Sequence, residues 1–231
     1  MGAMISPTDH LPDPLPEEPL EVAAAWLEES MRRRAVPNPN AMTLATATRD
    51  GRPTARIVLC KQIAAPPGYL VFYTNYRSRK GRELAENPYA AAVLHFDALQ
   101  CQVRIEGLVE RSPPEESDAY FASRPVESRI GAWASEQSEP IESREALQAA
   151  VAAAEHRFGV SPFQSAAAGR PQPGVPRPPH WGGYRLWAQA VELWVQGRAR
   201  IHDRARWSRR LDRVGGGRIE PGAWAVTRLQ P

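Results

Sequence analysis

The 231-residue sequence is poor in cysteine and lysine, and it has no long apolar run. Its two cysteines, Cys60 and Cys101, lie in apolar stretches without a CxxC spacing, which indicates buried thiols in a reducing cytosol rather than a disulfide or a metal site. No run of eighteen apolar residues occurs, and the first ten residues lack a basic segment followed by an apolar one. We therefore expect a cytoplasmic protein without a membrane partner.

Several well-known chemical motifs are also absent. The sequence contains no GxGxxG after a strand, no GxxxxGK[ST], no GxSxG and no HExxH, which leaves dinucleotide-binding, P-loop, α/β-hydrolase and zincin folds without support. The five histidines show no ligand spacing with one another or with the cysteines. No metal is expected.

Composition fits a globular chain with a real core, since 42% of residues are hydrophobic and 24% are charged. The net charge of +3 suits either a nucleic acid or anionic metabolites. Of the 29 basic residues, 27 (29 minus 2) are arginine. In a chain that uses arginine for nearly every cation, the two positions that remain lysine, Lys61 and Lys80, indicate a role that is specific to the compact ammonium group.

Strand-like patterns dominate the first half of the chain. Residues 1–19 are an extended, Pro-rich segment, and helical spacing of apolar residues predicts a helix that begins at Leu20 and ends in the basic run at 32–34. Five strand-like runs follow within about seventy residues, with one short helix between the third and the fourth. This spacing predicts a mainly β protein with flanking helices, built on an antiparallel sheet or barrel; the five runs cover residues 42–48, 54–63, 69–74, 89–96 and 100–110.

Helix signals return in the middle of the chain. A helix is expected after Ser112 as N-cap, with Pro113 in its first position and Glu115 completing a capping box. An Ala-rich helix over 143–158 would end at Gly159. Residues 160–180 carry six prolines and two glycines, which predicts a linker or a long ordered loop before further strands.

The stretch YTNYRSRKGRELAENP raises the first question of function. Ser78 is placed to cap a helix over 79–86, and Arg79 and Lys80 fall in its first turn, where the helix dipole disfavours cations and favours anions. A bound phosphate would resolve this conflict, because free N–H groups and both cations could hold it. The alternative is a solvated basic turn.

Two further stretches concentrate polar groups in apolar surroundings. RIVLCK places Arg56 and Lys61 at the two ends of an otherwise buried strand. Strict alternation would put their side chains on opposite faces, where they could touch different ligand groups. Alternatively, a bulge brings them to the same face, or one of them is an exposed strand end. If the strand over 191–195 continues through RIHDR, Arg200, His202 and Arg204 share one face. That face is either solvated or holds an anion, and Trp194 is either an aromatic wall or core.

Taken in order, the motifs resemble the pyridoxine/pyridoxamine 5′-phosphate oxidases. The resemblance runs from about residue 15 to the C-terminus. It rests on RIVLCK, FYTNYRSRKGRELAENP, QV at 102, YFASRPVESRIGAWASEQS, HWGGYRL, ELW, RIHDR and the terminal RLQP. It implies an FMN-binding split β-barrel with Greek-key-like antiparallel strands, formed by a single domain over 20–231, with FMN at a homodimer interface.

The resemblance also implies a set of ligand contacts. The phosphate of the substrate would be held by Lys61, Tyr120, Arg124 and Ser128, while Arg200 and His202, the implied catalytic residues, would face its pyridine ring. FMN would be bound by Arg56, Ile57, Val58, Leu59, Cys60, Lys61, Tyr73, Thr74, Arg79, Lys80, Gln102, Gln137, Ser138, Trp194 and Arg204.

The implied reaction is the oxidation of pyridoxine 5′-phosphate or pyridoxamine 5′-phosphate to pyridoxal 5′-phosphate. FMN would take the hydride, O₂ would be the final acceptor, and H₂O₂ would be released, with NH₃ from the amine substrate. The segment SPTDHLPDP departs from the basic or Tyr-containing sequence that often precedes LPxxPL in this family, which puts a lid there in doubt.

Two other functions compete with this interpretation. One is a related FMN oxidase of the phenazine-biosynthesis type, which shares the flavin residues but not the set formed by Tyr120, Arg124, Ser128, Arg200 and His202. The other is a basic protein that binds nucleic acid, or flavin without turnover. The sequence is rich in strands and has no separate basic tail, which argues against a nucleic-acid partner.

Overall fold

The computed structural model describes residues 10–160 and 174–231, which form two compact units. The sheet unit takes its residues from 1–72, 86–110 and 185–231, and the helical unit takes its residues from 73–85 and 111–184. Neither unit is one continuous stretch of chain. The expected division into an extended segment over 1–19 and a single domain over 20–231 stays a prediction, and residues 161–173 of the expected Pro-rich loop lie outside the described part.

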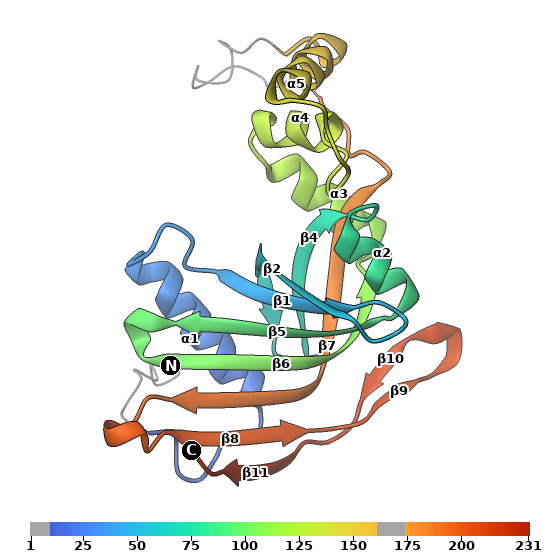
Figure 1. The fold of residues 1–231 in the computed structure, drawn as a ribbon. Coiled ribbons are helices and arrows are strands. Elements are labelled where there is room, and N and C mark those ends of the chain that lie inside the picture. The colour runs from blue at the N-terminus through green and yellow to red at the C-terminus, as the bar shows by residue number, and fades with distance from the viewer. Residues whose placement is uncertain (1–9, 161–173) are drawn as a thin grey trace. The chain divides into compact units, whose positions relative to one another are not determined.

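A mainly antiparallel sheet curled into a half-barrel forms the sheet unit, as the sequence predicted (Figure 1). The strand order along it is β11-β8-β7-β6-β5-β1-β2, and β3 pairs with β4, which also pairs with β7. Its strands are β1 (Ala41–Ala47), β2 (Pro53–Leu59), β3 (Gln62–Ala64), β4 (Tyr69–Asn75), β5 (Tyr89–Phe96), β6 (Cys101–Arg111), β7 (Trp181–Val195), β8 (Asp203–Ser208) and β11 (Ala225–Leu229).

Alternation of side chains builds the core of this sheet. Strands β1 and β6 alternate between buried and half-buried residues along nearly their whole length. The buried side includes Met42 and Leu44 from β1 and Val103 and Ile105 from β6. The turn between the first two strands has Gly51 at φ 83°, and the Gly51 N–H donates to the carbonyl of Thr48 at 2.9 Å.

The second expected strand, over 54–63, is interrupted. Strand β2 ends at Leu59, and β3 begins at Gln62 after Cys60 and Lys61. The interpretation of RIVLCK as a buried strand is wrong for β2, because β2 is an edge strand that pairs only with β1 and leaves Ile57 63% exposed.

Helix α1 (Pro19–Arg33) forms where the apolar spacing predicted it. It buries Leu20, Ala23, Trp26 and Leu27, and it contacts β3 and β5 of the sheet. Residues 10–18, which precede it, form neither helix nor strand, and the Leu11 N–H donates to the Asp203 carboxylate at 2.8 Å. The segment over 10–18 is thus held against strand β8, while residues 1–9 lie outside the described part.

Both cysteines are free and buried, as expected. Burial raises the pKa of each thiol to about 12, so almost no reactive thiolate forms near neutral pH. We expect the folded protein to react only slowly with a disulfide reagent at about pH 8, and to yield both thiols once it is denatured. Rapid labelling of either thiol in the folded protein would contradict this expectation.

The described part of the helical unit contains four further α-helices. They are α2 (Arg79–Glu86), α3 (Pro114–Ser123), α4 (Val126–Ala134) and α5 (Arg144–Phe158). Three of them, α3, α4 and α5, contribute to a small apolar core. Helix α5 begins and ends as predicted: Ser143 Oγ accepts from the Ala146 N–H at 3.1 Å, and Gly159 adopts φ 63°. Helix α4 was not predicted, and its Val126 and Ile130 pack in the core with Phe121.

The expected start of α3 is wrong. Pro114, not Pro113, occupies the first turn, and Pro113 is the N-cap without a side-chain cap. A residue that precedes proline is pushed out of the helical region, so the second proline sets the boundary. Ser112 Oγ instead donates to the Glu116 carboxylate at 3.0 Å, and no capping box with Glu115 forms.

The end of the chain forms an additional hairpin. Strands β9 (Leu211–Arg213) and β10 (Ile219–Pro221) pair across the turn at Gly215–Gly217. Within residues 10–160 and 174–231, no helix is long and apolar enough to cross a membrane.

Candidate functional site

The start of α2 is built for polar contacts. Helix α2 spans the predicted residues, and Ser78 Oγ lies 3.4 Å from the Gly81 N–H that it caps, while it donates to the Asn75 carbonyl at 2.7 Å. A Cβ on Gly81 would lie 2.1 Å from the carbonyl oxygen of Tyr76, so only glycine fits this first turn. No acidic residue occupies the turn, so its dipole remains available to an anion.

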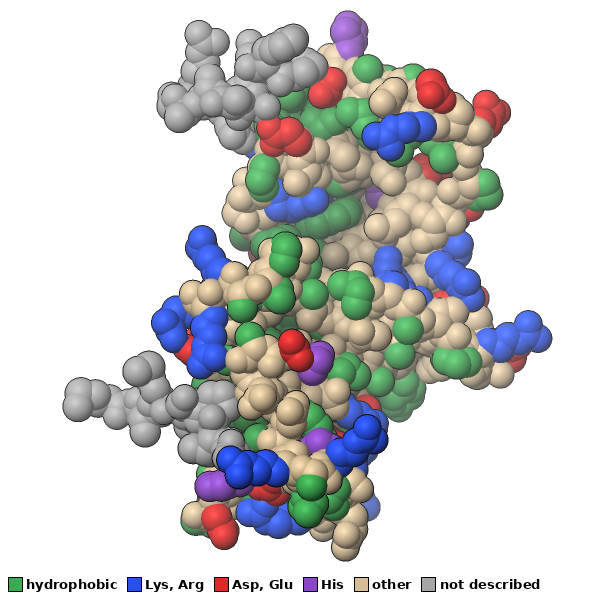
Figure 2. Space-filling model, turned by 60° about the vertical axis from the view of Figure 1, so that its left-hand side comes forward, with side chains coloured by type: hydrophobic (Ala, Val, Ile, Leu, Met, Phe, Trp, Pro, Cys, Tyr) green, Lys and Arg blue, Asp and Glu red, His purple; other side chains and the backbone are tan. Residues whose placement is uncertain are grey.

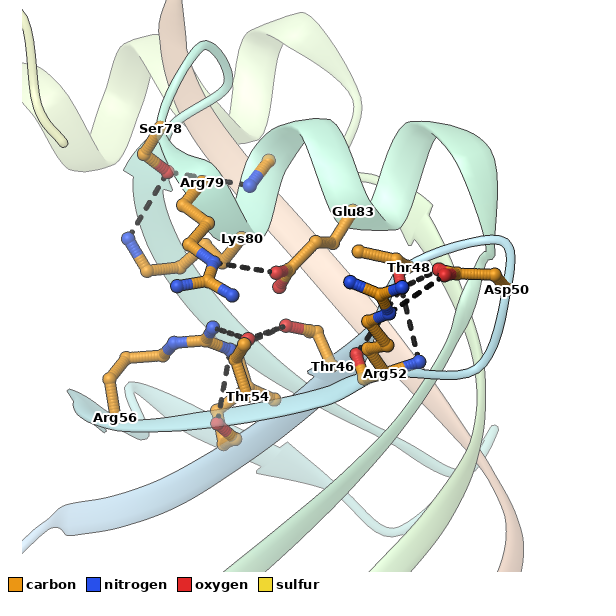
Figure 3. Close-up of polar contacts among 12 residues, drawn as sticks. Thr46, Thr48, Asp50, Arg52, Thr54, Arg56, Ser78, Arg79, Lys80 and Glu83 are labelled. Carbon is orange, nitrogen blue, oxygen red and sulfur yellow. Dashed lines mark hydrogen bonds and ion pairs between the residues drawn. The ribbon is translucent and has the colours of Figure 1, made fainter. Parts of the chain in front are cut away.

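Lys80 is a buried cation within this turn, only 7% exposed (Figure 3). Its ammonium donates to Thr74 Oγ1 and Ser78 Oγ at 3.1 Å and to Gln137 Oε1 at 2.8 Å. Thr74 also donates to Gln137 at 3.1 Å. Three of the predicted FMN residues, Thr74, Lys80 and Gln137, therefore meet here, and the oxygens of Thr74, Ser78 and Gln137 solvate the ammonium.

The neighbouring Arg79 is 62% exposed on its side chain. Its Nε donates to Glu83 Oε1 at 3.0 Å, and the Glu83 side chain is only 4% exposed (Figure 3). The buried carboxylate holds one edge of the guanidinium. The opposite edge remains suited to a charged oxygen.

Aromatic rings surround a second cation in the helical unit. Tyr73 stacks on Tyr120 with ring centroids 3.9 Å apart and on Trp181 with centroids 5.5 Å apart. The guanidinium of Arg124 lies 4.6 Å from the Trp181 ring centroid. Burial lowers the pKa of Arg124, and its buried Nη1 has no hydrogen-bond partner among the described residues. An unsatisfied buried donor on a cation indicates a place for an anion.

Two other predicted residues of the helical unit have been placed. Ser128 is half-buried in α4, two residues after its start at Val126. Ser138 is exposed, follows Gln137 and adopts φ 76°.

In the sheet unit, Arg56 is held by neutral oxygens. Its Nη1 donates to the Leu44 carbonyl at 3.2 Å and to Thr46 Oγ1 at 2.5 Å, and its Nη2 donates to Thr54 Oγ1 (Figure 3). Lys61 is exposed between β2 and β3, so alternation along one strand does not relate it to Arg56. In the rest of RIVLCK, Val58 and Leu59 are half-buried and Cys60 is 1% exposed.

The expected shared face of RIHDR is wrong. Strand β7 ends at Val195, a 3₁₀ turn covers Arg198–Arg200, and β8 begins only at Asp203. Arg200 adopts φ 65°, which no strand permits. Residues 200–202 therefore belong to the turn between two antiparallel strands, and Arg204 alone of the three cationic positions lies in a strand.

His202 and Trp194 do come together at this turn. The His202 ring lies 4.5 Å from the Trp194 ring, and its Nδ1 accepts from the Gly197 N–H at 3.2 Å. That bond leaves Nε2 as the ring nitrogen that faces other groups. Gln102 is half-buried on β6, where it is in register with His95 of β5.

Arg204 meets a carboxylate that the motif analysis did not single out. Its Nε and Nη2 donate to Glu192 Oε1 at 3.1 and 2.8 Å, and its Nη1 donates to the Gln230 carbonyl at 2.9 Å. Glu192 belongs to the ELW motif and Gln230 to RLQP, so sequence comparison highlighted both stretches without revealing this contact. Trp181, in the HWGGYRL motif, was likewise missed as a stacking partner.

Each unit thus brings together a group of the predicted residues. The helical unit groups Thr74, Lys80 and Gln137, and separately Tyr73, Tyr120 and Arg124; the sheet unit groups Trp194 and His202. Among the described residues, no cluster of three histidine, cysteine or acidic side chains could hold a metal ion.

Family comparison explains this combination of residues. Residues 27–158 match the family model described as pyridoxamine 5′-phosphate oxidase. The chain belongs to the pyridoxamine 5′-phosphate oxidase family. Residues 181–231 match a second model, the C-terminal dimerisation region of pyridoxine 5′-phosphate oxidase. The resemblance inferred from the motifs is confirmed.

Relatives in this oxidase family cover nearly the whole chain. A pyridoxine/pyridoxamine 5′-phosphate oxidase of Paraburkholderia phymatum is 50% identical over 206 residues, which is 89% of this chain and 85% of the relative. One from Cupriavidus metallidurans is 44% identical over 231 residues, covering 100% of this chain and 95% of the relative.

Solved structures agree on the fold of the family. PhzG from Burkholderia lata, in complex with tetrahydrophenazine-1-carboxylic acid, superposes with a TM-score of 0.76 at 33% identity and covers 95% of each chain. A pyridoxamine 5′-phosphate oxidase-related, FMN-binding protein from Nostoc punctiforme shares the fold at 18% identity, with a TM-score of 0.63 over 92% of this chain and 97% of that one.

Proposed function

We propose that this protein is an FMN-dependent oxidase that converts pyridoxine 5′-phosphate and pyridoxamine 5′-phosphate to pyridoxal 5′-phosphate. O₂ is the final acceptor, H₂O₂ is released, and the amine substrate also yields NH₃. Relatives that are 44% and 50% identical carry this activity in their names. The observation that carries the substrate assignment is Arg124, whose guanidinium lies over the Trp181 ring and whose buried Nη1 has no hydrogen-bond partner among the described residues.

The residues present fit FMN. The first turn of α2 offers backbone N–H groups, the buried Lys80 ammonium and the Arg79 guanidinium, a donor set that suits a phosphate monoester. When bound, FMN accepts the hydride from the substrate. The proposed FMN residues remain those that the motif resemblance implied, from Arg56–Lys61 on the sheet unit to Gln137 and Ser138 on the helical unit.

On the substrate side, the protein supplies placement and charge. We assign the substrate phosphate to Lys61, Tyr120, Arg124 and Ser128, because these groups offer donors to three phosphate oxygens. Arg200 and His202 are assigned to the pyridine ring, with His202 Nε2 available to orient the substrate or to move a proton.

A homodimer is part of the proposal. The C-terminal region matches a dimerisation model, and its strands β8 and β11 form one end of the large sheet within the described residues. Equilibrium sedimentation should find two chains per particle. A monomer that turns over substrate would contradict this part of the proposal.

The decisive experiment is an aerobic assay of the purified protein with added FMN, in which pyridoxal 5′-phosphate is followed by its absorbance. FMN-dependent turnover of either phosphorylated substrate supports the proposal. The structural likeness to PhzG names the alternative, so a reduced tricyclic carboxylic acid of the phenazine type belongs in the same assay. Turnover of that compound alone would replace the substrate assignment while leaving the flavin chemistry in place.

Nucleic-acid binding is the less supported alternative. On the face drawn in Figure 2, Lys and Arg side chains lie in separate small groups with acidic and neutral side chains between them. A continuous basic track along a phosphate backbone is absent from that face.

Replacing Arg79 by alanine should weaken FMN binding about tenfold, because one charge-assisted contact to the phosphate is lost. Fluorescence titration of the apoprotein with FMN measures the change. Arg82→Ala is the matched control: Arg82 lies on the same helix but donates to the Arg77 carbonyl and to Glu139. Equal FMN affinity in wild type and Arg79→Ala would remove Arg79 from the proposed site.

A further inference from the structure

Glu192 is a buried carboxylate, only 3% exposed, near the C-terminal end of β7. Its two oxygens are shared between neighbouring strands. Oε1 accepts from Arg204 on β8, and Oε2 accepts from Arg104 Nη1 on β6 at 3.2 Å. A carboxylate costs several kcal/mol to bury unless such partners compensate it. Because a buried ion pair of this kind adds little net stability, the contact between Glu192 and Arg204 has a role other than stabilising the fold.

The arrangement restrains Arg204 from three directions. Arginine has five N–H donors, and those on Nε and Nη2 bind Glu192 while one on Nη1 binds the Gln230 carbonyl. Two N–H groups, one on each terminal nitrogen, remain for another acceptor. A long side chain that would otherwise sample many rotamers is thus presented in one orientation.

A comparison within the same sheet shows what is particular to Glu192. Glu106 on β6 also binds two arginines, with Arg104 Nη2 at 3.1 Å and Arg206 Nη2 at 2.8 Å. It is 35% exposed and has no contact with Arg204. Glu106 therefore carries the same charge as Glu192 and shares Arg104 with it, but its second partner is Arg206 instead of Arg204.

We propose that Glu192 is a positioning residue that fixes the Arg204 guanidinium so that its two remaining N–H groups meet FMN. The inference rests on the proposed function, which assigns Arg204 to the flavin. Glu192 itself needs no contact with the cofactor. Oε1 of Glu192 orients the Arg204 guanidinium, and the backbone carbonyl of Gln230 provides the remaining restraint.

The test is a double-mutant cycle on FMN affinity, measured by titrating the apoprotein. Glu192→Gln replaces one accepting oxygen by an amide donor, which repels one of the two guanidinium groups. We expect it to weaken FMN binding about tenfold and Arg204→Gln to do so at least as much. The double variant should bind no more weakly than Arg204→Gln, and the absorption spectrum of bound FMN should change alike in both single variants.

Glu106→Gln is the matched control and should leave the FMN affinity and the spectrum unchanged. If the effects of Glu192→Gln and Arg204→Gln add, Glu192 does not act through Arg204 and the inference fails. Unchanged FMN affinity in Arg204→Gln, with wild-type protein that binds FMN, also overturns it. Wild-type protein that binds no FMN would overturn the proposed function and this inference together. Glu192→Asp, which keeps the charge but shortens the reach, gives the same comparison if the glutamine variant does not fold.

Discussion

Replacing Arg124 by alanine is expected to raise the KM for pyridoxine 5′-phosphate roughly thirtyfold, which corresponds to about 2 kcal/mol of lost binding. The guanidinium lies against the Trp181 ring, and its buried Nη1 has no partner among the described residues. A phosphate oxygen would satisfy that nitrogen with a charge-assisted hydrogen bond. Steady-state kinetics with both phosphorylated substrates measures the change, and kcat should fall much less than kcat/KM.

A control for this variant comes from the same unit. Arg157 also lies over aromatic rings, with its guanidinium 4.5 Å from the Trp133 ring centroid, but it belongs to α5 and is not among the proposed ligands. Arg157→Ala should therefore leave the KM unchanged. If Arg124→Ala also leaves it unchanged while FMN remains bound, Arg124 does not hold the substrate phosphate.

Local signals explain which elements could be predicted from the sequence. Helix α5 has a serine cap, an Ala-rich body and a terminal glycine, and each of these acts within one turn of the helix. The hairpin between β1 and β2 is likewise defined by strand alternation and Gly51. Where two local rules competed, as at Pro113 and Pro114, the restriction before proline prevailed over the capping pattern.

Burial and tertiary pairing could not be predicted in the same way. Ile57 is an apolar residue of the type found in protein cores, yet its side chain is exposed because β2 lies at the edge of the sheet. The order of strands in the sheet sets this edge position, and local sequence does not reveal it. The site shows the same division. Ser78 and Lys80 lie two residues apart, and the dipole argument placed them correctly at the start of α2. The contact between Lys80 and Gln137 spans 57 residues, so no local pattern contains it.

The turn at RIHDR shows how a single small residue decides the position of two proposed catalytic groups. A Cβ on Gly197 would lie 1.7 Å from the carbonyl oxygen of Ile201, far inside any allowed contact. Gly197 also donates its N–H to His202 Nδ1, and Arg200 adopts φ 65° within the same turn. The close approach of backbone to backbone is therefore what turns the chain from β7 into β8.

Gly197→Ala should open this turn and displace Arg200 and His202 by an ångström or more. Such a displacement costs about a hundredfold in kcat/KM when the displaced groups orient the substrate. Gly215→Ala is the control, because Gly215 has nothing within 4 Å of an added Cβ and lies in the β9–β10 hairpin connection. Wild-type kcat/KM in a folded Gly197→Ala variant would show that the reaction does not depend on the geometry of this turn, and Arg200 and His202 would lose their assigned roles.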